Sequence, residues 1–293
     1  YSKNLKTFQV KRRTVMIKKA AVINDLSGFG KCSLTATIAV LSVMGVQPCP
    51  MPTAVLTNQT GYKNHYCIDL TDELCHYKEM WSLNNESFDG IYSGYIADKK
   101  QVDIIFDFIN TFRKSSTIVL VDPVMGDNGR LYSAFSNETC KKVCSLARSA
   151  DIITPNLTEL CILTDTDFEE LNSHCENDDF LERISDVAKS AFSHSEQKIV
   201  VTGIKKGNYL YNGVFTKQDC SFVKAECHGG SFSGTGDIFA SIVFASVVNG
   251  ESLVSAVKKA VSFIEKATAD TAKEPYDRND GINFEKFLYQ LHN

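Results

Sequence analysis

The sequence predicts an α/β fold, in which a three-layer α/β/α sandwich is built around one mostly parallel central sheet. Short apolar runs alternate with longer amphipathic ones through most of the 293 residues. Such alternation is typical of βαβ units, whose parallel strands are covered by helices on both faces. No Pro-, Gly- or Ser-rich linker, internal repeat or low-complexity tract interrupts it. We therefore expect one domain over residues 17–293, preceded by a flexible extension over residues 1–16.

The elements follow from the length and spacing of the apolar runs. Short runs predict strands, and these fall at 20–24, 48–56, 90–93, 117–121, 151–154 and 198–202. Longer amphipathic runs predict helices, at 33–44, 72–83, 99–113, 140–149, 159–163, 179–192, 237–249 and 253–272. The pattern changes after residue 205, where 208–211, 213–216 and 221–227 are typical of antiparallel strands. The pair Asn212-Gly213 predicts a hairpin turn between the first two of them.

Composition narrows the class of protein. A hydrophobic fraction of 43% and a charged fraction of 23% are ordinary for a globular chain. The net charge of −4 gives no electrostatic case for nucleic acid, and no apolar run reaches the roughly 20 residues that span a bilayer. The ten cysteines form no CxxC pair, and residues 1–16 lack the apolar core of a secretory signal. We therefore expect free thiols, a cytoplasmic location, and neither nucleic-acid nor membrane partners.

The sequence Ser233-Gly234-Thr235-Gly236-Asp237 runs directly into a predicted helix. Glycines let the backbone turn and a ligand approach closely. The N-terminus of a helix presents unpaired N–H groups and a partial positive charge, which together bind anions. This arrangement suits phosphoryl transfer, with Asp237 taking a proton from an attacking hydroxyl. An ordinary loop with Asp237 as a helix cap explains the motif equally well.

Other polar residues follow predicted strands, at the sheet edge where ligands of parallel sheets bind. They are Asn24, Asp25, Asp122, Asn156 and Thr202. Their convergence on one edge indicates a site more strongly than any single motif does.

Three carboxylates among these motifs are candidates for organising Mg²⁺. Asp122 and Asp127 lie in Val121-Asp122-Pro123-Val124-Met125-Gly126-Asp127, and two acids near a phosphate site suit a hydrated Mg²⁺. Capping of a turn by Asp122 is the simpler explanation. Asn156 and Glu159 have the spacing of a capping box. Alternatively, Glu159 contacts a water of the Mg²⁺ shell and Asn156 lies near nucleotide phosphates, and both interpretations can hold together.

Two glycine-containing segments carry weaker signals. Gly28-Phe29-Gly30-Lys31-Cys32-Ser33 lacks the first glycine of a P-loop and has Cys after Lys, and it also fails the dinucleotide fingerprint. We interpret it as a loop beside a substrate pocket. The sequence from Asn58 to Tyr62 is either a turn or a set of side chains facing a heteroaromatic ligand.

Six motifs in order, over about residues 20–272, resemble the pyridoxal/pyridoxamine kinase family of the ribokinase-like superfamily. They are NDLSGFGKCSLTA (24–36), PTAVLTNQTGY (52–62), SGYI (93–96), VDPVMGD (121–127), ITPNLTE (153–159) and SGTGD (233–237). Hydroxymethylpyrimidine phosphate kinases share the VDPVM, TPN and GTG elements, but the 58–62 and SGY elements favour the vitamin B6 kinases. The resemblance implies ATP as co-substrate and Mg²⁺, leaves room for a monovalent cation such as K⁺, and implies a homodimer.

The resemblance also implies a role for each motif residue. Asp237 is the base that activates the 5′-hydroxyl of the substrate, and the N–H groups of Gly234, Thr235 and Gly236 form the anion hole. Asp122, Asp127 and Glu159 organise Mg²⁺, while Asn156, Thr202 and Asp122 lie along the ATP phosphates. The implied vitamer pocket contains Asp25, Ser27, Thr60 and Tyr95.

Asp25 departs from the family pattern, because many relatives carry Ser there. A carboxylate at this position can bond a protonated ring nitrogen or amine, which favours pyridoxamine. The alternatives are a hydroxymethylpyrimidine (phosphate) kinase of thiamine synthesis, a dual-specificity enzyme, a nucleoside or sugar kinase of the same superfamily, and a non-catalytic vitamer-binding protein. Intact glycines and Asp237 argue against the last.

Overall fold

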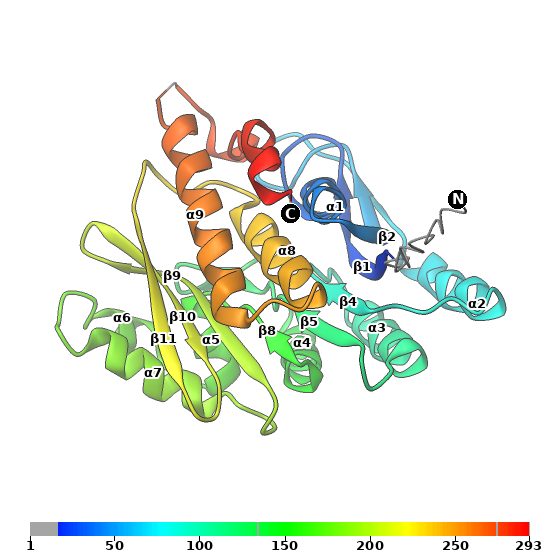
Figure 1. The fold of residues 1–293 in the computed structure, drawn as a ribbon, viewed down its shortest axis with the longest axis horizontal. Helices are drawn as coiled ribbons and strands as arrows, with labels where there is room; N and C mark the ends of the chain where they lie inside the picture. Colours follow the sequence, from blue (N-terminus) through cyan, green and yellow to red (C-terminus); the bar gives the residue numbers. More distant parts are fainter. Residues whose placement is uncertain (1–16, 134, 274, 293) are drawn as a thin grey trace, which may run out of the picture.

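The sheet of the computed structural model has the strand order β11-β10-β9-β8-β5-β4-β1-β2-β3 (Figure 1). The structure describes residues 17–133, 135–273 and 275–292. Strands β9, β8, β5, β4, β1 and β2 run parallel, while β3, β10 and β11 pair antiparallel at the two edges. The strand bounds are β1 (Lys18–Ser27), β2 (Val46–Leu56), β3 (Cys67–Asp69), β4 (Gly90–Ser93), β5 (Ile118–Val121), β8 (Ile152–Ile153), β9 (Lys198–Lys206), β10 (Tyr209–Phe215) and β11 (Cys220–Glu226).

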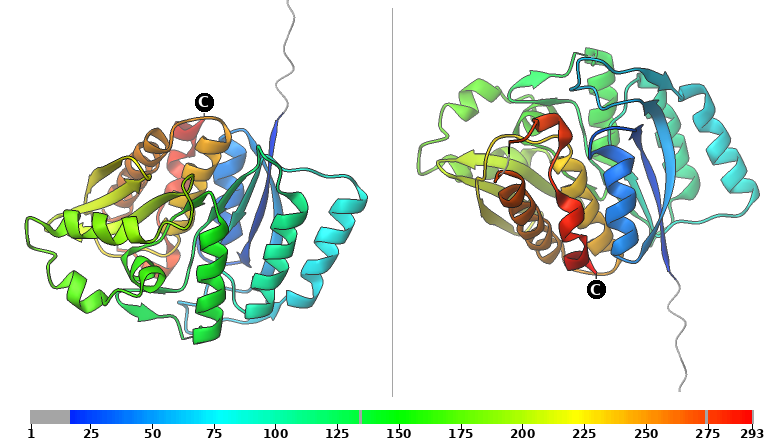
Figure 2. Two further views of the ribbon diagram at one scale, coloured as in Figure 1. Left: turned by 90° about the horizontal axis from the view of Figure 1, so that it is seen from below. Right: turned by 90° about the horizontal axis from the view of Figure 1, so that it is seen from above.

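Helices cover both faces of this sheet, so the predicted three-layer α/β/α sandwich is confirmed (Figure 2). One face carries α1 (Ser33–Val43), α8 (Thr235–Val248), α9 (Leu253–Thr271) and the 3₁₀ helix η3 (Phe284–Leu291). The other carries α2 (Leu74–Leu83), α3 (Lys99–Phe112), α4 (Asn137–Ser149), α5 (Leu157–Thr164), α6 (Phe168–Asn172) and α7 (Phe180–Ser190). The remaining elements are η1 (Thr71–Glu73), η2 (Arg278–Asp280) and a hairpin of β6 (Gly126–Asp127) and β7 (Arg130–Leu131).

The core is divided into two parts by the sheet. Along β1, Ala20 and Val22 join the cluster under α1, α8 and α9, whereas Ala21 and Ile23 join the cluster on the opposite face. Strand side chains alternate between faces, so a strand covered on both sides must be apolar at every position. This requirement explains why the parallel strands appear in the sequence as continuous apolar runs.

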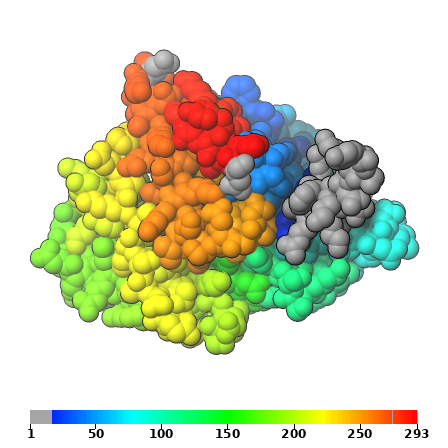
Figure 3. Space-filling view, in the orientation of Figure 1, coloured from blue at the N-terminus to red at the C-terminus, as the bar shows by residue number. Residues whose placement is uncertain are grey.

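Helix α8 is the most deeply buried helix of the layer formed by α1, α8, α9 and η3. Most of its residues from Ile238 to Val248 are buried, because it lies between the sheet, α1 and α9. Figure 3 shows α9 and the C-terminal segment at this face of the molecule, between α1 and the antiparallel strands. A helix that is apolar all round is held in place by packing, and its N-terminus, which carries Asp237, is therefore fixed at the sheet edge.

The predicted turn at Asn212-Gly213 is wrong. Both residues lie inside β10, where Gly213 pairs with Val201 on one side and Phe222 on the other. A Cβ on Gly213 would stand 2.5 Å from the Phe215 ring, so the glycine serves close packing instead of a turn. The register shifts between Tyr211 and Gly213, as in a β-bulge.

Several other elements were not predicted, namely β3, the β6–β7 hairpin, α6, η2 and η3. All of them except η3, which spans eight residues, are too short to give a periodic pattern. None of the helices in the described ranges is long and apolar enough to cross a membrane. The predicted extension over residues 1–16 lies outside the described residues, and the single-domain expectation remains a prediction.

Candidate active site

The N-terminus of α8 is formed by the glycine-rich motif. Gly234 precedes the helix with φ +79°, and a Cβ on it would lie 2.0 Å from the carbonyl oxygen of Lys31. Only glycine fits this conformation and this close approach. The first intrahelical bond runs from the N–H of Ile238 to the Gly234 carbonyl at 3.1 Å. The N–H groups of Thr235 and Gly236 therefore precede the helical ladder and are available to an anion.

At Gly236, by contrast, the packing of the protein does not require a glycine. A Cβ built on it would meet no protein atom within 4 Å. The surrounding protein therefore leaves room for a side chain at this position. The space beside the helix N-terminus is free for a ligand.

Asp237 lies in the first turn of α8 and is held by Asn24. The Asn24 amide donates to the Asp237 carboxylate at 3.1 Å. The Asn24 carbonyl oxygen accepts the N–H groups of Asp25 and Tyr95, each at 3.0 Å. Asn24 is fully buried, and a Cβ on Gly94 would stand 2.4 Å from its amide nitrogen. This side chain thus joins the ends of β1 and β4 to the candidate base.

Burial raises the pKa of Asp237 to about 6. Asp25 contributes to this rise, whereas the hydrogen bonds from the Ser33 backbone and from the Asn24 amide oppose it. A carboxylate with a pKa near neutrality accepts a proton more readily than one near its ordinary value. This environment suits a general base.

Asp25 is turned toward the start of α1. Its carboxylate accepts the hydroxyls of Ser27 at 2.9 Å and Ser33 at 2.6 Å. Burial raises its pKa, and these two hydroxyls oppose the rise. Asp25 and Ser27, both predicted to bind substrate, therefore bond to each other, and both Asp25 oxygens have protein partners.

Tyr95 and Thr60 come from different loops. Tyr95 packs edge-on against Phe135, with ring centroids 5.8 Å apart, and burial followed by Asp25 raises its pKa. Tyr95 therefore lies close to Asp25, and Phe135 is an aromatic neighbour that the sequence did not indicate. Thr60 is exposed on the loop beyond β2, next to Gln59, whose side chain bonds Asn279 at 3.0 Å.

Asp122 ends β5 and is buried beside Thr154, whose hydroxyl donates to one of its oxygens at 2.9 Å. Burial and the neighbouring Asp237 raise its pKa to about 7. The structure therefore brings these two predicted site residues together. Asp127 lies in the β6–β7 hairpin, and its oxygens accept the backbone and side-chain N–H groups of Asn128, both at 2.9 Å.

Asn156 and Glu159 form the predicted capping box, and the structure confirms both of its bonds. Glu159 also accepts the N–H of Met125 at 3.0 Å, and Asn156 donates to the Gly126 carbonyl at 2.8 Å. The pair thus fixes the loop that carries Asp127 to the start of α5. Thr202 follows on the next strand, in a parallel bridge with Asn156.

Tyr132 is a residue of this region that sequence reasoning missed. Burial raises its pKa, and the carboxylates of Glu159, Asp127 and Asp122 raise it further. Its phenol therefore stands in the field of all three predicted magnesium-organising residues. No motif marks it, because it joins them only through the fold of the hairpin loop.

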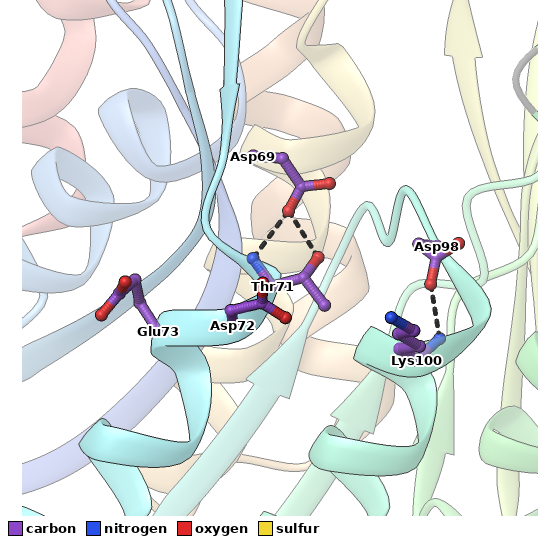
Figure 4. A pocket seen from close by; sticks show the side chains of 6 residues that line it. All are labelled: Asp69, Thr71, Asp72, Glu73, Asp98 and Lys100. Atoms are coloured by element: carbon purple, nitrogen blue, oxygen red, sulfur yellow. Dashed lines mark hydrogen bonds between the residues drawn. The ribbon is translucent and has the colours of Figure 1, made fainter.

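A separate cavity of about 400 Å³ lies between η1 and the start of α3 (Figure 4). Its lining is mainly acidic: Asp69, Thr71, Asp72, Glu73, Asp98 and Lys100. Asp69 and Asp98 bond the backbone N–H groups of Thr71 at 2.6 Å and Lys100 at 2.7 Å. None of the predicted site residues lines it, and its carboxylates would repel a phosphate.

Comparisons with known proteins show the family of the chain. The family model described as phosphomethylpyrimidine kinase matches residues 30–280. The crystal structure of a "putative phosphomethylpyrimidine kinase" from Bacteroides thetaiotaomicron, in a form with pyridoxal, is 37% identical with a TM-score of 0.82, covering 94% of this chain and 96% of that one. A pyridoxal kinase of Aliivibrio fischeri is 25% identical over 87% of this chain and 90% of its own length. The pyridoxal kinase of Lactobacillus plantarum shares the fold, with a TM-score of 0.84 at 24% identity, covering 94% of this chain and 96% of that one.

The fold and these similarities define a phosphotransferase with an alcohol acceptor, a kinase built on a mostly parallel sheet. The chain belongs to the phosphomethylpyrimidine kinase family, together with the pyridoxal kinases of the ribokinase-like superfamily.

Proposed function

We propose that this protein transfers the γ-phosphoryl group of ATP to the 5′-hydroxymethyl group of a vitamin B6 vitamer: pyridoxal, pyridoxamine or pyridoxine. One observation carries the proposal. A carboxylate held by Asn24 stands in the first turn of a helix whose glycine-rich N-terminus is open to an anion. Support for the substrate comes from the 37% identical relative crystallised with pyridoxal.

In this mechanism Asp237 takes the proton of the attacking hydroxyl. The O–H bond breaks as the new O–P bond forms, and the bond between the γ-phosphorus and the bridging oxygen breaks to release ADP. The N–H groups of Thr235 and Gly236, with that of Gly234, face the charge that develops on the transferring phosphoryl group. Asn24 holds the Asp237 carboxylate in position, because its side-chain amide donates a hydrogen bond to one of the two oxygens.

The carboxylates present fit a Mg²⁺ ion carried by the nucleotide. No group of three or more His, Cys, Asp or Glu side chains in the described part of the chain forms a metal cage. Mg²⁺ usually keeps several waters and takes one or two carboxylates together with substrate phosphates. Asp122 would hold it, with Asp127 and Glu159 near its waters. When bound, it would neutralise phosphate charge.

Asn156 and Thr202 would flank the phosphates from the ends of adjacent strands. Asp25, Ser27, Thr60 and Tyr95 would form the vitamer pocket, with Tyr95 against the ring. Because both Asp25 oxygens accept serine hydroxyls, Asp25 would act on a protonated ring nitrogen or amine mainly through its charge. A homodimer and a K⁺ requirement remain predictions.

The description of the matching family model favours a second candidate, a kinase of hydroxymethylpyrimidine or its phosphate. Both reactions use the same base and anion hole and differ in the ring that the pocket accepts. The test is an ATP- and Mg²⁺-dependent assay with pyridoxal, pyridoxamine, pyridoxine and hydroxymethylpyrimidine in parallel. Turnover of a B6 vitamer supports the first candidate, turnover of the pyrimidine alone supports the second, and turnover of none removes both.

A further inference from the structure

The segment after α9 crosses back to the glycine-rich loop before α8. We call residues 276–281 the C-terminal strap (Figure 1). The Arg278 carbonyl accepts the N–H of Ser233 at 2.9 Å, and the Tyr276 hydroxyl accepts the N–H of Gly230 at 2.9 Å. The Tyr276 ring also packs on Phe232, with centroids 4.5 Å apart. The strap therefore fixes the Arg278 backbone beside the residue that precedes Gly234.

The guanidinium of Arg278 points along the same loop. It donates to the Ser231 hydroxyl at 3.2 Å. Arg278 also acts on Tyr132: burial and three carboxylates raise the pKa of this phenol, and Arg278 opposes the rise. The guanidinium therefore lies on the glycine-rich loop that leads into the N-terminus of α8, and its charge acts on Tyr132.

Positive charge is scarce where a nucleotide would bind. Within the described residues, no lysine or arginine forms an ion pair with Asp25, Asp122, Asp127, Glu159 or Asp237. Lys31, whose carbonyl lies against Gly234, directs its ammonium at Asn283 and Glu285. A nucleoside triphosphate entering among these acids needs a cation, and the planar fork of arginine matches phosphate oxygens.

We propose that Arg278, presented by the C-terminal strap, binds the terminal phosphate of the nucleotide. Its guanidinium stays bound to this phosphoryl group while the group is transferred to the acceptor. The proposal rests on the proposed kinase function. Arg278 is exposed and bonds one hydroxyl through a single nitrogen, so the rest of its fork is free to meet a ligand. A purely structural role would need only the backbone bond to Ser233.

The test compares Arg278→Ala and Arg278→Lys with the unaltered protein in binding and turnover. For Arg278→Ala we expect a roughly 10- to 100-fold weaker affinity for Mg-ATP, the range of a charged hydrogen bond. ADP affinity should fall by much less, because ADP lacks the terminal phosphate. Turnover of the vitamer should fall by a similar factor, with its KM unchanged. Arg278→Lys should recover part of the loss, since it keeps the charge and loses the fork.

Two controls separate this role from a structural one. Arg183→Ala removes an exposed arginine paired within α7 and should change nothing. Ser231→Ala removes the tether and keeps the guanidinium, so it should retain most ATP affinity. Equal losses for ATP and ADP, no loss for either, or a fall in melting temperature that explains the loss would overturn the proposal. Because ATP binding is measured without an acceptor, it tests Arg278 even if no vitamer is phosphorylated.

Discussion

Replacing Asp237 with Asn should remove most of the turnover and stabilise the protein at neutral pH. The carboxylate is partly enclosed, and burial together with Asp25 raises its pKa from 3.8 to about 6. A group whose folded pKa lies above its unfolded value binds its proton more tightly in the folded state. The free energy of unfolding therefore decreases as pH rises from about 4 to about 6, and the cost is complete at pH 7.

The magnitude follows from the shift. About two pKa units correspond to about 3 kcal/mol at pH 7, which is an upper value. Asparagine carries no charge and avoids this cost, but it weakens the bonds from Asn24 and Ser33. We expect a net gain of roughly 1 to 2 kcal/mol, or about 2 to 8 °C in Tm. Loss of the base should reduce kcat about 10²- to 10⁴-fold.

The assay measures Tm and kcat for both proteins, with Asp186→Asn, at an exposed position of α7, as the matched control. The gain in Tm at pH 7 should shrink as pH falls toward 4, because the carboxylate is then protonated in the folded protein. In the unaltered enzyme, kcat/KM should decline below about pH 6. An Asp237→Asn protein that turns over normally would remove Asp237 as the base. An inactive variant that is less stable at pH 7 would refute the electrostatic reasoning.

Three further perturbations test the surrounding site. Asn24→Ala should reduce kcat roughly tenfold or more, because one charge-assisted hydrogen bond to Asp237 is lost. The acid limb of the pH profile should move to higher pH, because this bond lowers the pKa of Asp237. An unchanged profile would contradict the positioning role of Asn24. Gly234→Ala should lower Tm, because its φ of +79° disfavours alanine and the new Cβ would clash with the Lys31 carbonyl. Gly236→Ala should leave Tm unchanged and raise the KM for ATP, because its Cβ would enter the space beside the helix N-terminus. Equal effects of the two variants on Tm would be inconsistent with this difference. Glu159→Gln should require more Mg²⁺ for half-maximal turnover, because the carboxylate near the waters of the ion is lost while a glutamine can still complete the capping box; an unchanged Mg²⁺ titration would leave Glu159 a purely structural residue.

The sequence determined the features that depend on local pattern. Apolar runs predicted the parallel strands, because a strand buried on both faces has no polar position. The spacing of Asn156 and Glu159 predicted a capping box, since its two bonds close within four residues. The glycines before Asp237 predicted a helix N-terminus for the same local reason.

Only the tertiary structure decided what lies around these motifs. Asn24 reaches Asp237 across 213 positions of sequence, and the strap brings Arg278 to Ser231 across 47. Asn212-Gly213 matched a turn locally but lies in the middle of a strand, because distant segments in β9 and β11 pair with it on both sides. Local pattern records the conformation that a segment prefers. Contacts between distant segments depend on how the whole chain packs, and in this protein those contacts place and tune the candidate base.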